Sequence, residues 1–364
     1  MRGYRQGPRK DRRNQSLISL RVSYGLRERI NTHMQAEITK RLEPGDMLDH
    51  YRVEAAIAHG GMSTLYRAVD VNSGKRVALK VPHAEMEADP VLLERFKREQ
   101  EIGQELDHPG VVKTFNGEQR SRLYMVIEWV EGRLLRSILN EEGIDGGRRL
   151  QIDRAVSITL KLCDALDYMH KHGVVHRDLK PENVIVTSDD QIKLLDFGIA
   201  MKEDARRLTF AGPSPMLGTP DYIAPEQVKG QRGDQRSDIY ALGAMFYEML
   251  TGQPPFTGPS PLAVMNERLI ADPQPARKLN PEISPQLEEV LCRALERDPR
   301  HRYATTHEMI WDLEHPETVG VEEGSQRLSL RERAFPGGRK LMIYAVLALV
   351  PFLNFALMIA LAKH

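Results

Sequence analysis

The 364-residue sequence contains little cysteine and has no net charge. Its two cysteines, Cys163 and Cys292, are too few for a disulfide framework and cannot form a metal-binding cluster by themselves. Internal repeats and low-complexity tracts are also absent. The remaining composition is ordinary for a globular protein, with 41% hydrophobic and 28% charged residues. We therefore exclude a wholly disordered, collagen-like or disulfide-scaffold protein and expect about two domains, or one two-lobed domain, with appendages.

The charge balance of the whole chain does not extend to its N-terminus. Residues 1–45 contain eleven Lys or Arg and far fewer Asp or Glu. We predict a basic arm that is at least partly disordered. Such an arm could bind nucleic acid or an anionic membrane surface, but a solvated tail is the simpler interpretation, and we expect no specific nucleic-acid partner.

The sequence has one long uncharged hydrophobic run, residues 341–362. As an α-helix rising about 1.5 Å per residue, this run would span roughly 33 Å, enough to cross the hydrocarbon core of a bilayer. A buried core helix is the alternative, but soluble helices of this length normally have a polar face, and this segment has none. We predict a transmembrane helix at 341–362, preceded by a polar juxtamembrane linker at 316–340.

The charges that flank the hydrophobic run predict its orientation. Five Lys or Arg shortly precede the run, whereas Lys363 and His364 follow it. The positive-inside rule then predicts a single-pass protein of the inner (cytoplasmic) membrane, held in the lipid bilayer with its long N-terminal part in the cytoplasm. We expect no extracytoplasmic sensor domain. Asn354, in the middle of the run, could hydrogen-bond to a second copy, which leaves a homodimer open.

The region between arm and linker has a strand-rich first part and a mainly helical second part. Strands are predicted at Leu65–Val69, Arg76–Val81 and Leu123–Val130, with an amphipathic helix at Val91–Leu106. The clearest helix of the second part is Arg154–His172, which has one apolar face and is followed by Gly173, as expected for a C-terminal cap.

Short motifs in a fixed order carry the chemistry of this region. Residues 176–183 read His-Arg-Asp-Leu-Lys-Pro-Glu-Asn, and Asp196-Phe197-Gly198 begins thirteen residues after Asn183. Further motifs agree in order: a Gly-rich turn at 58–63, Val77-Ala78-Leu79-Lys80, Glu99, Gly218-Thr219-Pro220, Ala224-Pro225-Glu226, Asp238 and Arg302. Over about residues 48–315 the chain resembles bacterial eukaryotic-like (Hanks-type) serine/threonine protein kinases.

This resemblance implies an α+β, two-lobed protein kinase fold. The N-lobe, about residues 48–130, would be a small antiparallel β-sheet with one helix, and the C-lobe, about residues 131–315, would be mainly helical. The resemblance also implies ATP and Mg²⁺ as cofactors, with Mn²⁺ as an alternative metal, and proteins with Ser or Thr as substrates. Asp-Leu-Lys-Pro-Glu-Asn at 178–183 and Thr219 resemble serine/threonine rather than tyrosine kinases.

The expected catalytic residues suit phosphoryl transfer, in which the protein mainly positions reactants and neutralises charge. Lys80 would bind the α- and β-phosphates, and Glu99 would hold its ammonium group by an ion pair. Asp178 would accept the proton of the substrate hydroxyl or orient that hydroxyl, and Lys180 would neutralise the moving phosphoryl group. Asn183 and Asp196 supply hard oxygen ligands, which Mg²⁺ prefers.

The Gly-rich turn departs from the family pattern, which would have glycines at 58, 60 and 63. This chain has Ala58 and Ser63 there, with an additional Gly61. Gly60 and Gly61 still allow the backbone to approach phosphates, so we expect ATP binding to survive. The backbone of Glu128 and Val130, in the strand that leads to the hinge, would bind adenine. The expected nucleotide-binding residues are Ile57, Ala58, Gly60, Gly61, Ser63, Leu65, Ala78, Lys80, Glu128, Val130 and Asn183.

Other residues would support or regulate the site. Glu226 and Arg302 resemble the family's buried ion pair, and Asp238 its buried acceptor that braces the catalytic loop. Arg177 could pair with a phosphorylated residue of the loop from Asp196 to Glu226, and Thr209 and Ser214 are the candidate phosphosites. Thr219 is expected to position that loop and the substrate.

We therefore expect a membrane-anchored serine/threonine protein kinase that also phosphorylates itself. One alternative is a membrane-tethered pseudokinase that acts as a scaffold, favoured by Ala58 and Ser63 alone. The other is a small-molecule phosphotransferase of similar fold. Arg177 and the motifs at 218–220 and 224–226, which would build a platform for a protein substrate, argue against the second alternative.

Overall fold

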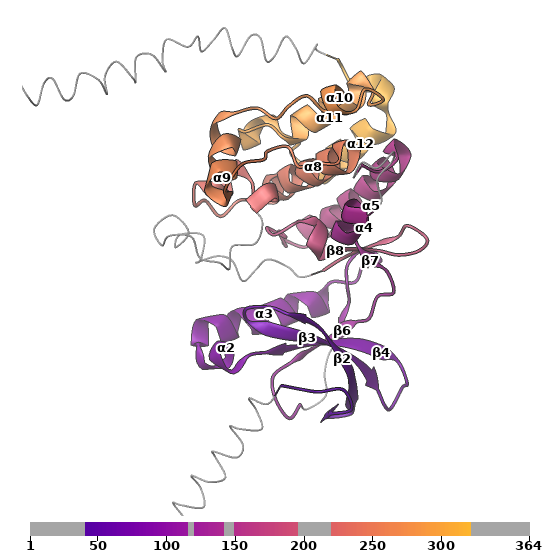
Figure 1. Ribbon diagram of the computed structural model, residues 1–364, viewed down its shortest axis with the longest axis vertical. Coiled ribbons are helices and arrows are strands. Elements are labelled where there is room, and N and C mark those ends of the chain that lie inside the picture. The colour runs from indigo at the N-terminus through magenta and orange to yellow at the C-terminus, as the bar shows by residue number, and fades with distance from the viewer. Residues whose placement is uncertain (1–40, 116–119, 142–148, 196–219, 322–364) are drawn as a thin grey trace, which may run out of the picture. The chain divides into compact units, whose positions relative to one another are not determined.

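In the computed structural model, the described residues are 41–115, 120–141, 149–195 and 220–321. They form two compact units (Figure 1). Of the described residues, those up to His108 and those of Val112–Glu131 form the N-terminal unit, and Pro109–Val111 with those from Gly132 onward form the C-terminal unit. The division therefore falls one residue later than the expected lobe boundary, and the three residues Pro109–Val111 belong to the second unit.

The N-terminal unit is built on a six-stranded antiparallel sheet with the strand order β1-β2-β3-β4-β6-β5. Its strands are β1 (Met47–Leu48), β2 (Tyr51–His59), β3 (Ser63–Asp70), β4 (Arg76–Pro82), β5 (Thr114–Phe115) and β6 (Met125–Glu128). Two helices follow β4 in the chain, α2 (Ala84–Ala88) and α3 (Pro90–Glu105). Asp89 caps α3 by accepting hydrogen bonds from the backbone N–H groups of Val91 and Leu92.

Side chains alternate across this sheet and separate two apolar clusters. Val77, Leu79 and Val81 of β4 join one cluster, against which Leu42 also packs, so the end of the expected basic arm is part of the folded unit. Met125 of β6 joins the other cluster, with Phe96 of α3. The alternation leaves Ala78 and Lys80 on the opposite face of β4 from Val77, Leu79 and Val81.

The C-terminal unit is mainly helical (Figure 1). Its α-helices are α4 (Leu135–Glu141), α5 (Ile152–Lys171), α7 (Pro225–Val228), α8 (Gln235–Thr251), α9 (Pro261–Ile270), α10 (Ala276–Leu279), α11 (Pro285–Ala294) and α12 (Thr306–Glu314). Helix α8 is almost wholly buried and contacts α5, α10 and α11. It is therefore the central element of this unit.

Short elements connect the helices. A three-stranded antiparallel sheet contains β7 (Arg133–Leu134), β8 (Val184–Val186) and β9 (Ile192–Leu194). Four 3₁₀ turns are η2 (Pro181–Asn183), η4 (Pro220–Tyr222), η5 (Pro299–His301) and η6 (Pro316–Thr318). The expected linker at 316–340 thus begins with an ordered turn.

Three predicted boundaries need correction. The Gly-rich turn is shorter than residues 58–63, because Ala58 lies in β2 and Ser63 begins β3. The strand predicted at Leu123–Val130 is reduced to Met125–Glu128, since β6 pairs with its neighbours over those residues only. The strand predicted at Leu65–Val69 extends over Ser63–Asp70.

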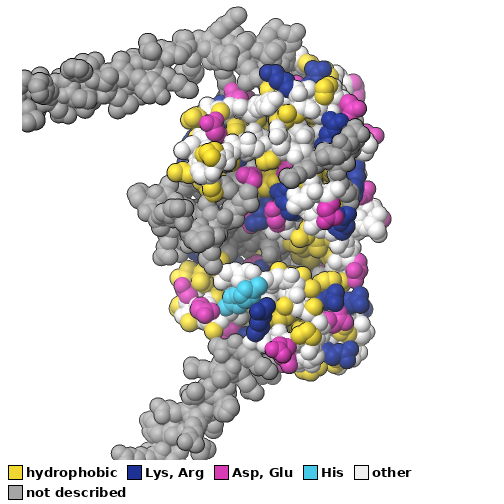
Figure 2. All heavy atoms as spheres, in the orientation of Figure 1, with side chains coloured by type: hydrophobic (Ala, Val, Ile, Leu, Met, Phe, Trp, Pro, Cys, Tyr) yellow, Lys and Arg dark blue, Asp and Glu magenta, His cyan; other side chains and the backbone are white. Residues whose placement is uncertain are grey.

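Figure 2 shows Lys, Arg, Asp and Glu side chains interspersed over the face in view, as expected for a chain with balanced charge. Within the ranges that the structure describes, no helix combines the length and the apolar character needed to cross a membrane. The predicted transmembrane segment at 341–362 lies outside those ranges.

Candidate active site

A buried ion pair in the N-terminal unit joins β4 to α3. Lys80 Nζ lies 2.7 Å from Glu99 Oε1, and the two side chains are only 15% and 11% exposed. The pair forms because alternation along β4 turns Lys80 toward the face opposite Leu79. Charge-assisted hydrogen bonds of this kind are short and directional. Glu99 therefore fixes the position of the Lys80 ammonium group.

Several expected nucleotide-binding residues lie in one row across the sheet. Ala58 of β2 pairs with Leu65 of β3, Leu65 pairs with Lys80 of β4, and Lys80 pairs with Met125 of β6. Paired residues of an antiparallel sheet point to the same side. The Lys80 ammonium group therefore shares a face with the apolar side chains of Ala58 and Leu65, and with Ala78 two residues earlier. Ile57 lies at a bulge of β2, between Ala56 and Ala58.

The turn between β2 and β3 is tight at Gly60. The backbone N–H of Gly60 donates to the carbonyl oxygen of Ser63 at 2.9 Å. A Cβ atom added at Gly60 would lie 3.2 Å from that same oxygen. The N–H of His83 holds the turn from the side by donating to the carbonyl of Met62. The turn therefore keeps its backbone close and compact without the family's glycines at 58 and 63.

The expected hinge residues lie at the end of β6 and just after it. Glu128 ends that strand, and its N–H donates to the carbonyl oxygen of Lys113. Val130 lies two residues later, outside the sheet. The N–H of Glu128 is thus used within the sheet.

The loop at 176–183 in the C-terminal unit brings three expected site residues together. Lys180 Nζ lies 2.8 Å from Asp178 Oδ2. Asn183 Nδ2 donates to the carbonyl oxygen of Asp178 at 2.8 Å and to Asp178 Oδ2 at 3.2 Å. Because Nδ2 makes both contacts, the amide oxygen of Asn183 faces away from the carboxylate. The loop thus presents a carboxylate, an ammonium group and an amide oxygen within one short segment.

A buried carboxylate on α8 holds the backbone of this loop. Asp238 is fully buried and accepts hydrogen bonds from the N–H groups of His176 and Arg177, at 2.9 and 2.7 Å. His170 Nε2 contacts the same carboxylate at 2.8 Å. Arg177 has φ of 64°, a left-handed conformation that is unusual for a residue with a side chain. The Asp238 contacts stabilise this conformation and so set the direction of Asp178.

A second buried carboxylate pairs two segments far apart in the chain. Glu226 of α7 accepts hydrogen bonds from Arg302 at 2.7 and 2.8 Å and from Ser237 at 2.6 Å. Burial alone would raise the pKa of Glu226, but the hydrogen bonds and charge of Arg302 outweigh burial and hold that pKa below its ordinary value. Glu226 is therefore ionised in the folded protein at neutral pH.

Four expected site residues lie outside the described residues: Asp196, Thr209, Ser214 and Thr219.

The sequence-family model of the protein kinase domain matches residues 51–312 of this chain. The chain belongs to the protein kinase family. A probable serine/threonine-protein kinase of Streptomyces coelicolor is 38% identical over 277 residues, which cover 75% of this chain and 40% of that protein. Serine/threonine-protein kinase PknB of Mycolicibacterium smegmatis is 36% identical over 286 residues, 77% of this chain and 44% of that protein.

The fold of this kinase domain is also similar to solved structures. The crystal structure of the Mycobacterium tuberculosis PknI kinase domain matches with a TM-score of 0.58 and 26% identity, covering 76% of this chain and 100% of that one. The chain spans less than half the length of the two curated relatives. The chain therefore contains a protein kinase domain, and its relatives are considerably longer proteins.

The kinase domain contains a charged cluster that the motifs do not reveal. Arg136 of α4 contacts Glu182, Tyr222 and Glu248, which lie on η2, η4 and α8. Gln227 of α7 was likewise missed, and its side chain donates to the carbonyl oxygen of Arg177. These residues are 46 to 112 positions from their partners. No local sequence pattern reports contacts of that kind.

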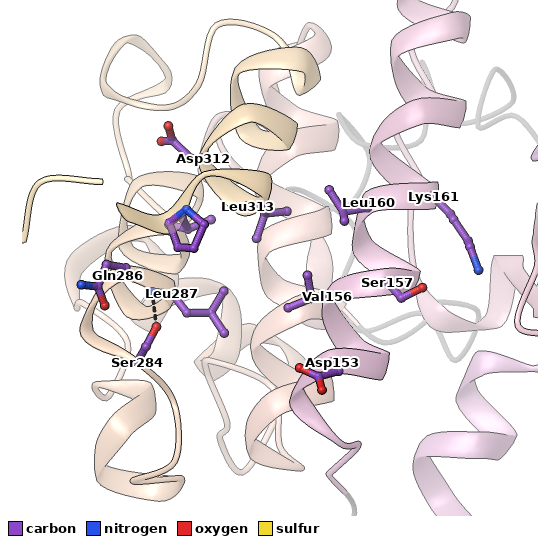
Figure 3. Close-up of a pocket in the computed structure, with 12 residues that line it drawn as sticks. Asp153, Val156, Ser157, Leu160, Lys161, Ser284, Gln286, Leu287, Asp312 and Leu313 are labelled. Atoms are coloured by element: carbon purple, nitrogen blue, oxygen red, sulfur yellow. Dashed lines mark hydrogen bonds between the residues drawn. The ribbon is translucent and has the colours of Figure 1, made fainter. Parts of the chain in front are cut away.

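A cavity of about 500 Å³ lies in the C-terminal unit, away from the loop at 176–183. It is bordered by α5, α11 and α12, and Figure 3 shows Val156, Leu160, Leu287 and Leu313 around it. The dashed line marks the hydrogen bond from Leu287 N–H to Ser284 Oγ, which caps α11. None of the expected site residues lines this cavity.

Proposed function

We propose that this chain is a protein kinase that transfers the γ-phosphoryl group of ATP to Ser or Thr hydroxyls of proteins, including its own. One observation carries the proposal: Asp178, Lys180 and Asn183 meet in a loop whose backbone is held by Asp238. A carboxylate fixed in this way can direct a hydroxyl group, and the neighbouring ammonium group can neutralise phosphoryl charge. The similarity to serine/threonine-protein kinases supports this substrate class.

In the proposed reaction, the hydroxyl oxygen of Ser or Thr forms a bond to the γ-phosphorus while the bond between that phosphorus and the β-bridging oxygen breaks. ADP leaves, and the hydroxyl proton passes toward the Asp178 carboxylate. Lys180 neutralises the phosphoryl oxygens during transfer. Lys80, held by Glu99 at 2.7 Å, binds the non-transferred phosphates.

The residues fit a nucleotide. Ala58, Leu65 and Ala78 share one sheet face with Lys80, so an apolar surface for the base adjoins a cation for phosphate. Gly60 and Gly61 carry no side chain, so phosphate can approach the backbone there, although the N–H of Gly60 itself donates to the carbonyl oxygen of Ser63. We assign adenine binding to the backbone at Glu128 and Val130.

The residues also fit Mg²⁺, which neutralises phosphate charge when bound. The amide oxygen of Asn183 is a hard ligand, and no described residue donates a hydrogen bond to it. We assign the second ligand to Asp196. Within the described ranges there is no cluster of three or more His, Cys, Asp or Glu suited to a metal ion.

The proposal is tested by incubating the purified full chain with radiolabelled ATP and Mg²⁺, alone and with Ser/Thr peptides, and mapping the labelled residues. We expect label on Ser and Thr of the chain and of peptides, with Thr209 and Ser214 as candidate sites. Binding of ATP without any transfer would instead indicate a pseudokinase scaffold. Label on small alcohols but not on peptides would indicate a small-molecule phosphotransferase.

We further propose that residues 341–362 anchor this kinase in the cytoplasmic membrane, with the kinase domain in the cytoplasm. The uncharged length of the segment and the preceding Lys and Arg residues support the proposal. Deleting 341–364 should move the protein from the membrane fraction to the soluble fraction and preserve autophosphorylation. If the shortened protein still sediments with membranes, the basic arm at 1–45 is the anchor instead.

A further inference from the structure

Arg136 is the centre of a charged cluster that has no place in the reaction described above. Its Nε donates to Glu182 Oε1 at 2.8 Å, and a terminal nitrogen donates to Glu248 Oε1 at 2.7 Å. The other terminal nitrogen donates to the hydroxyl oxygen of Tyr222, whose own hydrogen is donated to Glu248. One guanidinium group therefore satisfies three partners from three separate elements.

The cluster adjoins the catalytic loop. Glu182 lies between Pro181 and Asn183 in η2, four residues after Asp178. Tyr222 ends η4, which begins at Pro220 in the segment expected to hold the protein substrate. All four cluster residues belong to the C-terminal unit. A substrate whose hydroxyl reaches Asp178 would therefore pass close to this cluster.

The charge of the cluster is unbalanced. Two carboxylates meet one guanidinium group, and Oε2 of Glu182 is buried with no hydrogen-bond partner among the described residues. Burial disfavours the charged guanidinium, but the surrounding Tyr222, Glu248 and Glu182 outweigh it and raise the pKa of Arg136. The side chain of Arg136 is 23% exposed, so the cluster reaches the surface. Together Glu182, Tyr222 and Glu248 form an acceptor site with the geometry and charge to hold a guanidinium group.

We propose that Arg136 is a specificity-determining residue: it fills, from within the chain, a guanidinium site that would otherwise bind an arginine of the protein substrate. The wild-type kinase then phosphorylates substrates with and without an arginine near the acceptor hydroxyl with similar kcat/KM. Removing the Arg136 side chain opens the site and creates such a preference. This inference rests on the proposed kinase function.

The test uses peptides with one acceptor Ser and a single arginine placed in turn from three residues before it to three residues after it. Each peptide has a partner with citrulline, which keeps the shape of arginine and removes its charge. For the wild-type full chain, we expect the kcat/KM of each arginine peptide to lie within about twofold of that of its citrulline partner, at every position. For Arg136→Ala, we expect at least one position to favour arginine by about tenfold, since charge-assisted pairs are the strong ones.

The control is the triple variant Arg136→Ala, Glu182→Gln, Glu248→Gln, which lacks the acceptor charges. In this variant the kcat/KM of arginine and citrulline peptides should again agree within about twofold, because neutral amides bind guanidinium weakly. A structural role of Arg136 would lower the rates of both peptides together and leave their ratio unchanged. An unchanged ratio in Arg136→Ala, or a tenfold arginine preference already present in the wild type, would overturn the inference.

Arg136→Ala leaves the buried carboxylate of Glu248 and the partly exposed one of Glu182 without a cation, which destabilises the fold. A second measurement therefore does not depend on activity. Methylguanidinium at about 10 mM should raise the Tm of Arg136→Ala by several degrees, and should leave the wild type and the triple variant unchanged. Equal response of all three proteins contradicts the guanidinium site. A wild type without phosphotransfer but with this selective rescue would refute the proposed function alone.

Discussion

At the scale of single residues, the candidate site depends on the carboxylate of Asp178, which has two side-chain partners. Asp178 Oδ2 meets Lys180 at 2.8 Å and Asn183 at 3.2 Å. The carboxylate therefore has a fixed direction before any substrate arrives. The proposed proton transfer requires the negative charge of this carboxylate, and a neutral side chain of the same size and hydrogen-bonding geometry would not replace it.

Replacing Asp178 by Asn separates these two properties. The amide keeps the size of the side chain but cannot accept a proton, so Asp178→Asn should lower autophosphorylation by at least about a thousandfold. Binding of Mg·ATP, measured by calorimetry, should stay within about threefold of wild type, because the assigned phosphate and metal ligands are elsewhere. Autophosphorylation at the normal rate in this variant would show that the role of Asp178 is misassigned.

The sequence could predict residues that belong to motifs and could not predict their neighbours. The ion pair of Lys80 with Glu99, the brace at Asp238 and the pair of Glu226 with Arg302 form as predicted. Arg136 belongs to no motif, and its partners are set by how α4, η2, η4 and α8 pack. Such contacts follow from the tertiary fold, which no local pattern contains.

At the scale of elements, the prediction was best where periodicity is long. Helix α5 was expected at Arg154–His172 and occupies Ile152–Lys171, because twenty residues repeat one apolar face. The Gly-rich turn was expected at 58–63 and is shorter, since pairing of β2 with β3 continues to His59 and Thr64. Strand ends depend on the neighbouring strand, so a single segment cannot show where pairing stops.

The end of α5 provides a clean test of a helix cap. Gly173 has φ of 74°, and an added Cβ would meet no atom within 4 Å. Gly173→Ala should therefore lower the free energy of unfolding by about 1 kcal/mol, because only the left-handed backbone conformation is penalised. Urea titrations measure this difference. Gly320→Ala is the matched control: it has equal space but no left-handed φ, and should change stability by less than about 0.5 kcal/mol. Equal effects of both changes would contradict the cap.

At the scale of the whole molecule, ion pairs between distant segments hold the C-terminal unit together. Arg302 and Glu226 are 76 residues apart, and the arginine side chain is fully buried. Arg302 also donates to the carbonyl oxygens of Glu296 and Arg236. This guanidinium group therefore joins α7, the start of α8 and the segment before α12.

The pair of Glu226 with Arg302 should make the free energy of unfolding depend on pH. The folded pKa of Glu226 lies below its ordinary value of 4.5, so the carboxylate stabilises the fold above pH 4.5 and loses that contribution as pH falls through the folded pKa. Glu226→Gln should cost about 3–5 kcal/mol at pH 7, because it leaves Arg302 buried without its countercharge. Urea titrations should show that the difference in free energy of unfolding between wild type and variant is smaller at pH 3 than at pH 7. A gap that is constant with pH would refute the assignment.

The brace at Asp238 has a consequence for any division of the gene. The carboxylate that shapes the loop lies 62 residues downstream of His176 and 61 downstream of Arg177. A fragment that stops between the loop and α8 would carry Lys80, Asp178 and Asn183 intact, yet nothing in it would hold Arg177 in its left-handed conformation. Such a half would be inert by itself, and reassembly with a second half bearing α8 would be required to restore it.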